Sequence, residues 1–234
     1  MNATLVERLS HLSTAHLTDA CLRTGVPVRC APAGLRPIAP GMQCAGRARP
    51  ARHVGSVDVF LEALETATQG EVLVVDNDGR LDEACDGDLV ALEAKGAGVT
   101  GIVIWGLHRD SREIGEIGLP LFSLGALPTG PQRLDARPAD VFGCARVGTH
   151  LVTCSDFVVG DADGVLFLPE ARLDDITAAA VTIRDTERRQ AKAMATGRSL
   201  RHQLRFGEYM SRRDRDANYS FRQHLRDIQA AIEE

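Results

Sequence analysis

The chain has 234 residues and a formal net charge of −5, from 27 Lys and Arg against 32 Asp and Glu. This acidic balance argues against a nucleic-acid-binding protein, which normally carries a basic excess. Apolar residues make up 44% and charged residues 25% of the sequence, as in ordinary globular proteins, and no apolar run is long enough to cross a membrane. The N-terminus lacks the basic start and apolar core of a signal peptide, so we expect a cytoplasmic protein.

Six cysteines are scattered along the chain, and no two of them form a C-x-x-C pair. This spacing argues against a structural zinc site, and in a cytoplasmic protein it favours reduced, buried thiols. Three histidines, His16, His53 and His150, also show no metal-ligand spacing, and we expect them to be structural.

The first quarter of the chain predicts helices separated by an irregular segment. Apolar spacing predicts one helix over residues 3–24, with a break near Ser13 and Thr14, and another over residues 58–68. Residues 30–56 between them are rich in Gly, Pro and Ala, which favours loops and short strands, one of them over residues 43–48.

Residues 71–110 predict a βαβ unit. The segments 71–76 and 101–105 are apolar and β-branched, as in strands that are covered on both faces. Residues 87–95 have the composition of a short helix ended by glycines. Two such strands joined by a helix are normally parallel, so we expect a parallel pair here, with a further short strand over residues 119–124.

The C-terminal third predicts a hairpin followed by helices. Residues 157–159 and 165–168 flank a Gly- and Asp-rich turn and predict antiparallel strands. Residues 170–196 predict a long helix that ends at Gly197. Ser220 is a candidate N-cap of a final helix. The apolar stripe expected on that helix consists of Phe221, Leu225, Ile228 and Ile232.

The βαβ unit indicates where a ligand would bind. The start of its helix, residues 87–90, and the end of its second strand, residues 107–110, belong to the same edge of the sheet, the usual ligand crevice of α/β proteins. The helix N-terminus and Arg109 suit an anion, and Asp88 and Asp110 beside them suit a divalent cation. A 2-oxo acid is the simplest matching ligand. The alternative is a charged helix start at Asp88 and an ordinary surface pair of Arg109 with Asp110.

These three residues also form a motif. Twenty residues separate Asp88 from Arg109, and Asp110 follows at once. This resembles the D-x20-R-D signature of the class II pyruvate aldolases typified by 4-hydroxy-4-methyl-2-oxoglutarate aldolase, a family homologous to the regulator of ribonuclease activity A. Supporting context lies in residues 70–76, 98–104 and 161–169, and the resemblance covers about residues 15–200.

The resemblance implies a fold and an assembly. The fold would be α/β, a swivelling β/β/α domain or αββα sandwich, over residues 1–197. Residues 198–234 would form a helical C-terminal extension that packs on its own or a neighbouring subunit. The family implies a homotrimer or hexamer with active sites between subunits.

The resemblance also implies roles for individual residues. Arg109 would bind the carboxylate and carbonyl of the substrate, Asp110 would ligate Mg²⁺ (or Mn²⁺) directly or through its water shell, and Asp88 would orient a metal-bound water. Glu187 of a neighbouring subunit would complete the metal shell, unless it is simply a solvated side chain. The groups that would bind the pyruvate portion are the backbone amides of Gly87, Leu89 and Val90, together with Asp88 and Arg109.

Three features depart from the family pattern. Trp105 stands where relatives commonly have Asp, and His108 precedes Arg109 where small or apolar residues are more usual. The segment 154–156 replaces a common Pro-Gly-Asp turn. These changes leave the motif intact but bear on the shape of the pocket. His108 is open to two interpretations, an acid–base group or a packed side chain.

The expected function is retro-aldol cleavage of a 4-hydroxy-2-oxo acid to pyruvate by a metal-dependent lyase. The metal and Arg109 would stabilise the enolate, and a water positioned by Asp88 would move the proton. Decarboxylation of oxaloacetate passes through the same enolate and is expected as a side activity. The alternatives are a non-catalytic regulator that binds and inhibits a ribonuclease, and a lyase or hydrolase that acts on an unrelated metabolite with the same metal site.

Overall fold

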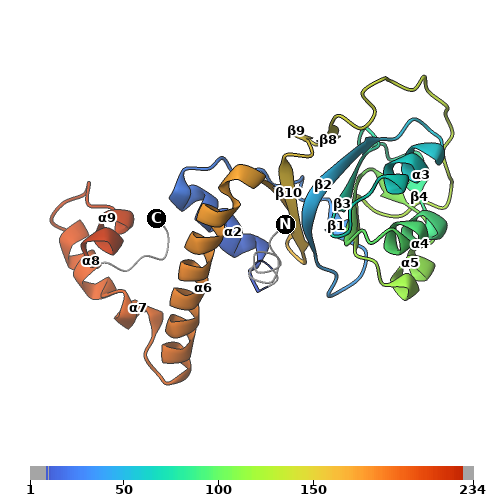
Figure 1. The fold of residues 1–234 in the computed structure, drawn as a ribbon. Coiled ribbons are helices and arrows are strands. Elements are labelled where there is room, and N and C mark those ends of the chain that lie inside the picture. The colour runs from blue at the N-terminus through green and yellow to red at the C-terminus, as the bar shows by residue number, and fades with distance from the viewer. Residues whose placement is uncertain (1–8, 10, 229–234) are drawn as a thin grey trace. The chain divides into compact units, whose positions relative to one another are not determined.

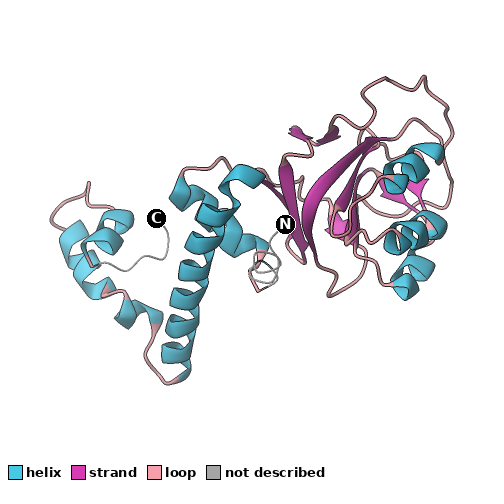
Figure 2. Cartoon of the chain, viewed as in Figure 1, coloured by secondary structure: helices cyan, strands magenta, loops and turns pink. Residues whose placement is uncertain are grey.

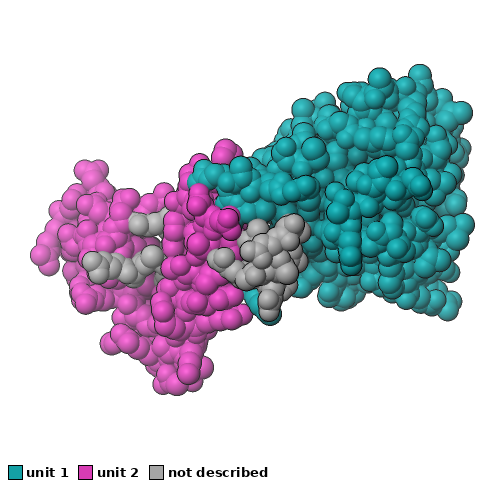
Figure 3. All heavy atoms as spheres, in the orientation of Figure 1, with its two compact units in different colours: residues 1–14, 28–173 teal, residues 15–27, 174–234 magenta. Residues whose placement is uncertain are grey.

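The computed structural model describes residue 9 and residues 11–228. The chain divides into two compact units, which Figure 3 colours separately. One comprises residues 1–14 and 28–173 and has mixed α/β structure, and the other comprises residues 15–27 and 174–234 and is helical. The α/β fold class expected from the sequence is confirmed. The expected domain boundary at residue 197 stays a prediction.

The α/β unit contains all of the strands found in the described part of the chain. In chain order they are β1 Arg36–Pro37, β2 Cys44–Arg52, β3 Val72–Asp76, β4 Ala84–Asp86, β5 Gly101–Trp105, β6 Leu107–His108, β7 Leu121–Ser123, β8 Ala145–Val147, β9 His150–Val152, β10 Asp156–Asp161 and β11 Gly164–Pro169. Seven of them form one curved sheet in the order β1-β7-β5-β3-β2-β10-β11 (Figure 2).

The centre of this sheet is parallel. Strands β2, β3, β5 and β7 run in the same direction, with antiparallel neighbours on both sides. The predicted parallel pair is confirmed, because β3 and β5 pair from Val72 with Gly101 to Asp76 with Trp105. The predicted hairpin is confirmed as β10 and β11.

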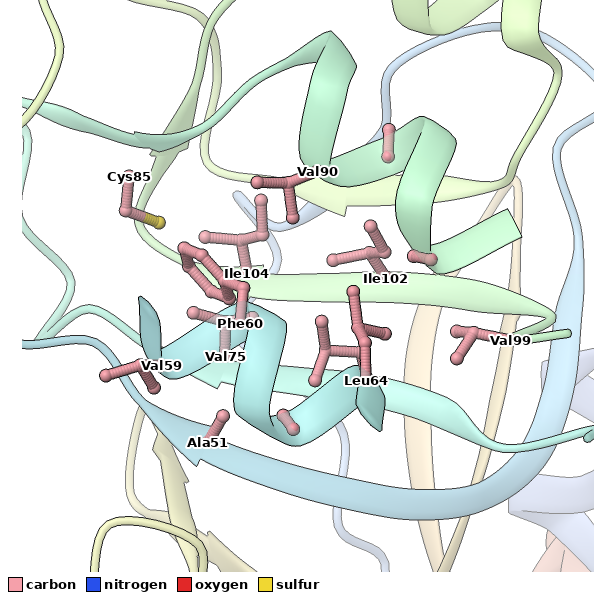
Figure 4. Close-up of a cluster of buried hydrophobic side chains, with 14 of the residues drawn as sticks. Ala51, Val59, Phe60, Leu64, Val75, Cys85, Val90, Val99, Ile102 and Ile104 are labelled. Atoms are coloured by element: carbon pink, nitrogen blue, oxygen red, sulfur yellow. The ribbon is translucent and has the colours of Figure 1, made fainter. Parts of the chain in front are cut away.

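Three helices cover one face of the sheet (Figure 1). They are α3 Asp58–Glu65, α4 Asp88–Gly96 and α5 Ser111–Ile117. Phe60 of α3 and Val90 of α4 pack against β-branched residues such as Val75 and Ile104 (Figure 4). The β8–β9 hairpin covers the other face through residues such as Val152. Because both faces are covered, β3 is buried along its whole length, as its continuous apolar run predicts.

Strand β2 is longer than the sequence predicts, because it continues past Ala48 to Arg52 and includes Pro50. Proline cannot donate a ladder hydrogen bond and is normally confined to positions with an open side. Strand β10 pairs only with residues Cys44–Arg47 of β2, so Pro50 has β3 as its single strand neighbour. The missing N–H therefore costs no strand pairing.

All six cysteines are free thiols. Cys21, Cys44 and Cys85 are buried, as expected, and burial raises the pKa of the Cys44 thiol to about 12. The expectation of burial is wrong for Cys30 and Cys154, which are exposed.

The second unit consists of helices. They are α2 Thr14–Thr24, α6 Leu173–Ala195, which follows a 3-10 turn over Glu170–Arg172, α7 Leu200–Gln203, α8 Phe206–Arg213 and α9 Phe221–Asp227. The predicted N-cap is confirmed, because the Ser220 side chain accepts a hydrogen bond from the Gln223 N–H at 3.1 Å. Of the predicted apolar stripe, Leu225 is buried, whereas Ile232 lies outside the described residues, as do residues 3–8 and 10 of the first predicted helix. No helix in the described part of the chain is both long and apolar enough for a membrane span.

Candidate functional site

The start of α4 and the segment after β6 lie side by side, as the sequence predicts. The two short strands that precede them, β4 and β6, form a parallel pair outside the main sheet, with Asp86 opposite His108. The Arg109 N–H donates to the Asp86 carbonyl at 2.9 Å. The juxtaposition thus comes from a separate backbone pair, which the sequence analysis did not anticipate, and not directly from the ends of β3 and β5.

Asp110 has an unusual backbone conformation. Its φ of 57° lies in the left-handed region, which residues other than glycine rarely adopt. It occupies the N-cap position of α5, yet its side chain makes no capping hydrogen bond there. The carboxylate instead lies 3.3 Å from Nε of Arg109 and accepts a hydrogen bond from the Asp88 N–H at 3.4 Å. A strained residue that directs its carboxylate toward a neighbouring helix start is typical of a functional site.

Two backbone N–H groups at the N-terminus of α4 already donate to carboxylates of the candidate site. The Asp88 carboxylate accepts from the Leu89 N–H at 2.8 Å, and the Asp88 N–H donates to Asp110. Of the amides expected to bind a carboxylate, the Leu89 N–H is therefore engaged by Asp88. A ligand at this helix start would either displace the Asp88 side chain or bind through the N–H groups of Gly87 and Val90.

Asp86 is a site residue that the sequence analysis missed. Its side chain is 3% exposed, and neither carboxyl oxygen has a hydrogen-bond partner among the described residues. Burial raises the pKa of this carboxyl to about 7. The nearby Gly87 N–H opposes this rise, although it lacks the geometry of a hydrogen bond, and the negative charge of Asp110 adds to it. The only local signal was an acid at the end of a short apolar segment, directly before Gly87.

A cavity of about 470 Å³ opens at this edge. The predicted residues Asp88 and Arg109 line it, and Asp110 contacts both of them without being part of the lining. The other lining residues include His53, the loop residues Gly55, Ser56 and Val57, and Asp86, Gly87, Leu89 and Val90. The cavity therefore combines a helix N-terminus, a guanidinium and three nearby carboxyl groups.

The two departures nearest to the motif do not line this cavity. His108 is buried, with Nδ1 2.7 Å from the Ser123 hydroxyl and Nε2 2.8 Å from the Ser111 hydroxyl. Burial lowers the pKa of His108, so the neutral ring bridges two serines as a packed side chain. The half-buried Trp105 packs over the turn at Gly79.

Glu187 belongs to the helical unit, where its carboxylate lies 3.1 Å from Nε2 of His16. Its expected role as a ligand contributed by a neighbouring subunit stays a prediction. The described residues contain no group of three or more His, Cys, Asp or Glu side chains that could hold a metal ion. Mg²⁺ often takes one or two protein carboxylates and keeps several waters, so Asp110 and Asp88 fit a partly hydrated ion.

Comparisons with known proteins place the chain in a family. Residues 14–167 match the model of the RraA-like family, described as Aldolase/RraA. The 4-hydroxy-4-methyl-2-oxoglutarate aldolase of Thermus thermophilus is 34% identical over 131 residues, which cover 53% of this chain and 79% of that protein. The protein DlpA of Legionella pneumophila is 26% identical over 207 residues, 84% of this chain but only 32% of that protein, so the chain spans about a third of that relative.

A solved structure also resembles this chain. It is RraAS2 of Streptomyces coelicolor, described as an unusual member of the RNase ES inhibitor RraA protein family. It matches with a TM-score of 0.67 and 26% identity over 80% of this chain and 96% of that one. The segment matched by the family model includes every residue of the cavity described above.

Proposed function

The chain belongs to the RraA-like (Aldolase/RraA) family, and from this membership and the site geometry we propose that it is a metal-dependent carbon–carbon lyase. The reaction would be retro-aldol cleavage of a 4-hydroxy-2-oxo acid to pyruvate and a second carbonyl compound. The observation that carries the proposal is the convergence of Asp88, Arg109 and Asp110 at the start of α4, beside one cavity.

Each residue has a distinct task in this proposal. The Arg109 guanidinium, half-exposed and facing the cavity, pairs with the carboxylate and carbonyl oxygens of the 2-oxo acid through its planar fork. The N-terminus of α4 adds its positive end to the same anion. Asp88 orients a water that delivers a proton to the enolate carbon once the carbon–carbon bond has broken.

Asp110, and Asp88 through water, would hold a divalent cation. When bound, the cation supplies Lewis-acid stabilisation of the enolate charge. Oxaloacetate decarboxylation produces the same enolate, so the proposal includes it as a second activity. Because Asp110 already neutralises part of the Arg109 charge, a cation at Asp110 would also leave the guanidinium freer to pair with the substrate.

The test is a coupled assay of pyruvate release from oxaloacetate and from 4-hydroxy-4-methyl-2-oxoglutarate. It compares Mg²⁺ with EDTA and subtracts the reaction without enzyme. We expect both activities to require the metal and to fall at least about 100-fold in Arg109→Ala, since electrostatic contacts to a developing anion have this magnitude. Arg112→Ala, which removes an exposed arginine of α5, is the control. Rates that respond neither to the metal nor to Arg109→Ala would exclude this mechanism.

We further propose a homo-oligomer, trimer or hexamer, in which Glu187 of one subunit completes the site of the next. Light scattering after gel filtration gives the assembly size. Mixing inactive Asp110→Asn protein with inactive Glu187→Gln protein should restore part of the activity, because some mixed sites then contain both wild-type residues. Absence of recovery from subunits that demonstrably exchange would contradict a shared site.

The second candidate is a regulator that binds a ribonuclease, and the likeness to RraAS2 favours it. Surface plasmon resonance against an RNase ES-type ribonuclease, with wild type and Asp110→Ala, separates it from the lyase. Binding that persists in Asp110→Ala, together with no lyase activity on any 2-oxo acid, would identify the regulator. Lyase activity without ribonuclease binding would identify the enzyme.

A further inference from the structure

His53, which the sequence predicts to be structural, lies in the wall of the candidate site. It follows β2 directly, and its N–H donates to the Asp76 carbonyl at 2.9 Å. His53 is 3% exposed, and its ring stacks on Phe60 with ring centroids 5.2 Å apart. It lines the cavity that also contains Asp88 and Arg109.

The hydrogen bonds around the ring determine its tautomer. Nη2 of Arg133 donates to Oδ1 of Asn77 at 2.8 Å, and since a guanidinium can only donate, the amide oxygen must face it. Nδ1 of His53 lies 2.9 Å from this same oxygen. Nδ1 must therefore carry the hydrogen, and the lone pair of the neutral ring is on Nε2.

Arg133, the group that fixes this arrangement, forms ion pairs with Glu83 and Asp135, although its Nε makes no hydrogen bond among the described residues. Nε of Arg133 lies 3.0 Å from Oε1 of the fully buried Glu83, and Nη1 pairs with Asp135 at 2.5 Å. Nη2 also donates to the His53 carbonyl at 3.3 Å. Arg133 thus orients the Asn77 amide and the His53 backbone together, as a third group orients the base in other catalytic sites.

The Nε2 atom is unsatisfied. It is shielded from water and has no hydrogen-bond partner among the described residues. A buried polar atom without a partner is uncommon in native proteins and is costly to leave unpaired. Burial lowers the pKa of His53, and the charge of Arg133 acts in the same direction, against the Asn77 hydrogen bond and the acids Glu83 and Asp58. The ring is accordingly a neutral base with an unused lone pair beside the cavity.

We propose that Nε2 of His53 accepts the proton of the 4-hydroxyl group when the substrate is cleaved. This inference rests on the proposed lyase function and assigns its first step. The O–H proton moves to Nε2, the oxygen forms the new carbonyl, and the bond between C3 and C4 breaks. Its electron pair remains on C3 as the pyruvate enolate, which takes a proton from the water at Asp88, while the imidazolium returns its proton to solvent.

Contact with the hydroxyl requires a small movement, because Nε2 is enclosed in the ligand-free chain. Residues 55–57 line the same cavity, and the proposal requires a shift in this part of its wall when the substrate binds. His53 also lines a second cavity, of about 460 Å³, at the ends of β2 and β3. If cleavage of the 4-hydroxy acid depends on His53, Nε2 acts in the cavity that Asp88 and Arg109 line and not in this second one.

The experiment compares two reactions of one protein. Cleavage of 4-hydroxy-4-methyl-2-oxoglutarate needs a base for the hydroxyl, whereas oxaloacetate decarboxylation has no hydroxyl proton to remove. We expect His53→Gln to lower kcat/KM for cleavage by about 100-fold or more while decarboxylation stays within about 3-fold of wild type. The acid limb of the pH profile for cleavage should also disappear. His150→Gln, in which the altered histidine packs on Phe167 and does not line the cavity, should change neither reaction.

The possible outcomes are distinct. Equal losses of both reactions, or no loss of either, would overturn the assignment to His53 and leave the lyase function intact. Wild-type protein that performs neither reaction would instead refute the lyase function itself. NMR of wild-type protein, which does not depend on the folding of a variant, should show a protonated Nδ1 and an unprotonated Nε2 at pH 7. A ring protonated on Nε2 would also overturn the proposal.

Discussion

The backbone of Gly87 lies directly against the carboxylate of Asp110. A Cβ atom at position 87 would overlap Oδ2 of Asp110 and come within 3.2 Å of Nε of Arg109. Only glycine therefore allows the start of α4 to approach the Arg109-Asp110 pair this closely. The requirement here is space and not backbone conformation, because the φ of Gly87 is −148°, which any residue can adopt.

This contact predicts the effect of Gly87→Ala. The added methyl group must push Asp110 or Arg109 away, so we expect kcat/KM for pyruvate release to fall by about 100-fold or more, as displacements of about 1 Å at a reacting centre can cause. Gly96→Ala, at the other end of α4, meets no atom within 4 Å and is the matched control. It should keep full activity. An active Gly87→Ala protein would show that Asp110 is not needed in its present position.

Arg109→Lys tests the planar fork of the guanidinium. Lysine keeps the charge but binds a carboxylate as a point charge, so we expect KM for the 2-oxo acid to rise by about 10-fold. The melting temperature should stay unchanged, because the Arg109 side chain is half-exposed and its ion-pair partner among the described residues, Asp110, is itself partly exposed. Steady-state kinetics and thermal unfolding measure both, with Arg112→Lys as control. An unaltered KM would place the substrate carboxylate elsewhere.

Asp86 predicts a pH dependence of stability in metal-free protein. Its carboxyl has a pKa of about 7 in the folded chain, against about 4 for an unfolded aspartate. The folded state therefore holds the proton more tightly, and stability falls as pH rises from about 4 to about 7. Asp86→Asn removes this loss, so its gain in melting temperature in EDTA should be larger at pH 8 than at pH 5. Asp82→Asn, at an exposed carboxylate of the same segment, controls for charge alone. A gain that is equal at both pH values would contradict the raised pKa of Asp86 as the cause of the pH dependence.

Removing the Glu83 carboxylate should cause a large loss of stability. Its side chain is fully buried and lies within 3.2 Å of Nε of Arg80 and 3.0 Å of Nε of Arg133. Glu83→Ala removes the buried carboxylate that Arg80 and Arg133 share and leaves each of them with one other, exposed partner, Asp82 or Asp135. Breaking a buried ion pair in this way costs about 3 to 5 kcal/mol of the free energy of unfolding. Glu62→Ala, which removes an exposed partner of Arg137, should cost less than about 1 kcal/mol. Urea unfolding of both variants makes the comparison, and equal losses would show that the Glu83 network is not stabilising.

The local sequence pattern was sufficient to predict elements that are marked by an apolar run, a glycine or a capping residue. β5 begins and ends at the predicted residues, because an apolar run between glycines has few alternatives. The helix after Gly87 and the cap at Ser220 follow from local chemistry in the same way. The helix and the cap are held by hydrogen bonds between residues close in the chain, whereas β5 pairs with the distant strands β3 and β7 and is recognised by its own apolar run.

The parts that could not be predicted depend on residues far apart in the chain. Arg133 is 80 positions from His53, yet it orients the amide that determines the tautomer of that ring. Nothing near Asp86 in the sequence shows that its carboxyl is buried, since the burial comes from tertiary packing. Strand β2 was predicted too short because Pro50 normally ends a strand, and only the limited extent of β10 makes it acceptable.

Trp105 is the single tryptophan of the chain, and it packs over the turn that contains Asn77 and Gly79. Its carbonyl accepts hydrogen bonds from the N–H groups of both residues at 3.1 Å. Fluorescence excited at the red edge of the indole band therefore comes from one place in the molecule. Its emission wavelength follows the hydration of this turn, so Trp105 serves as a built-in optical probe of the segment that holds the Asn77–His53 hydrogen bond.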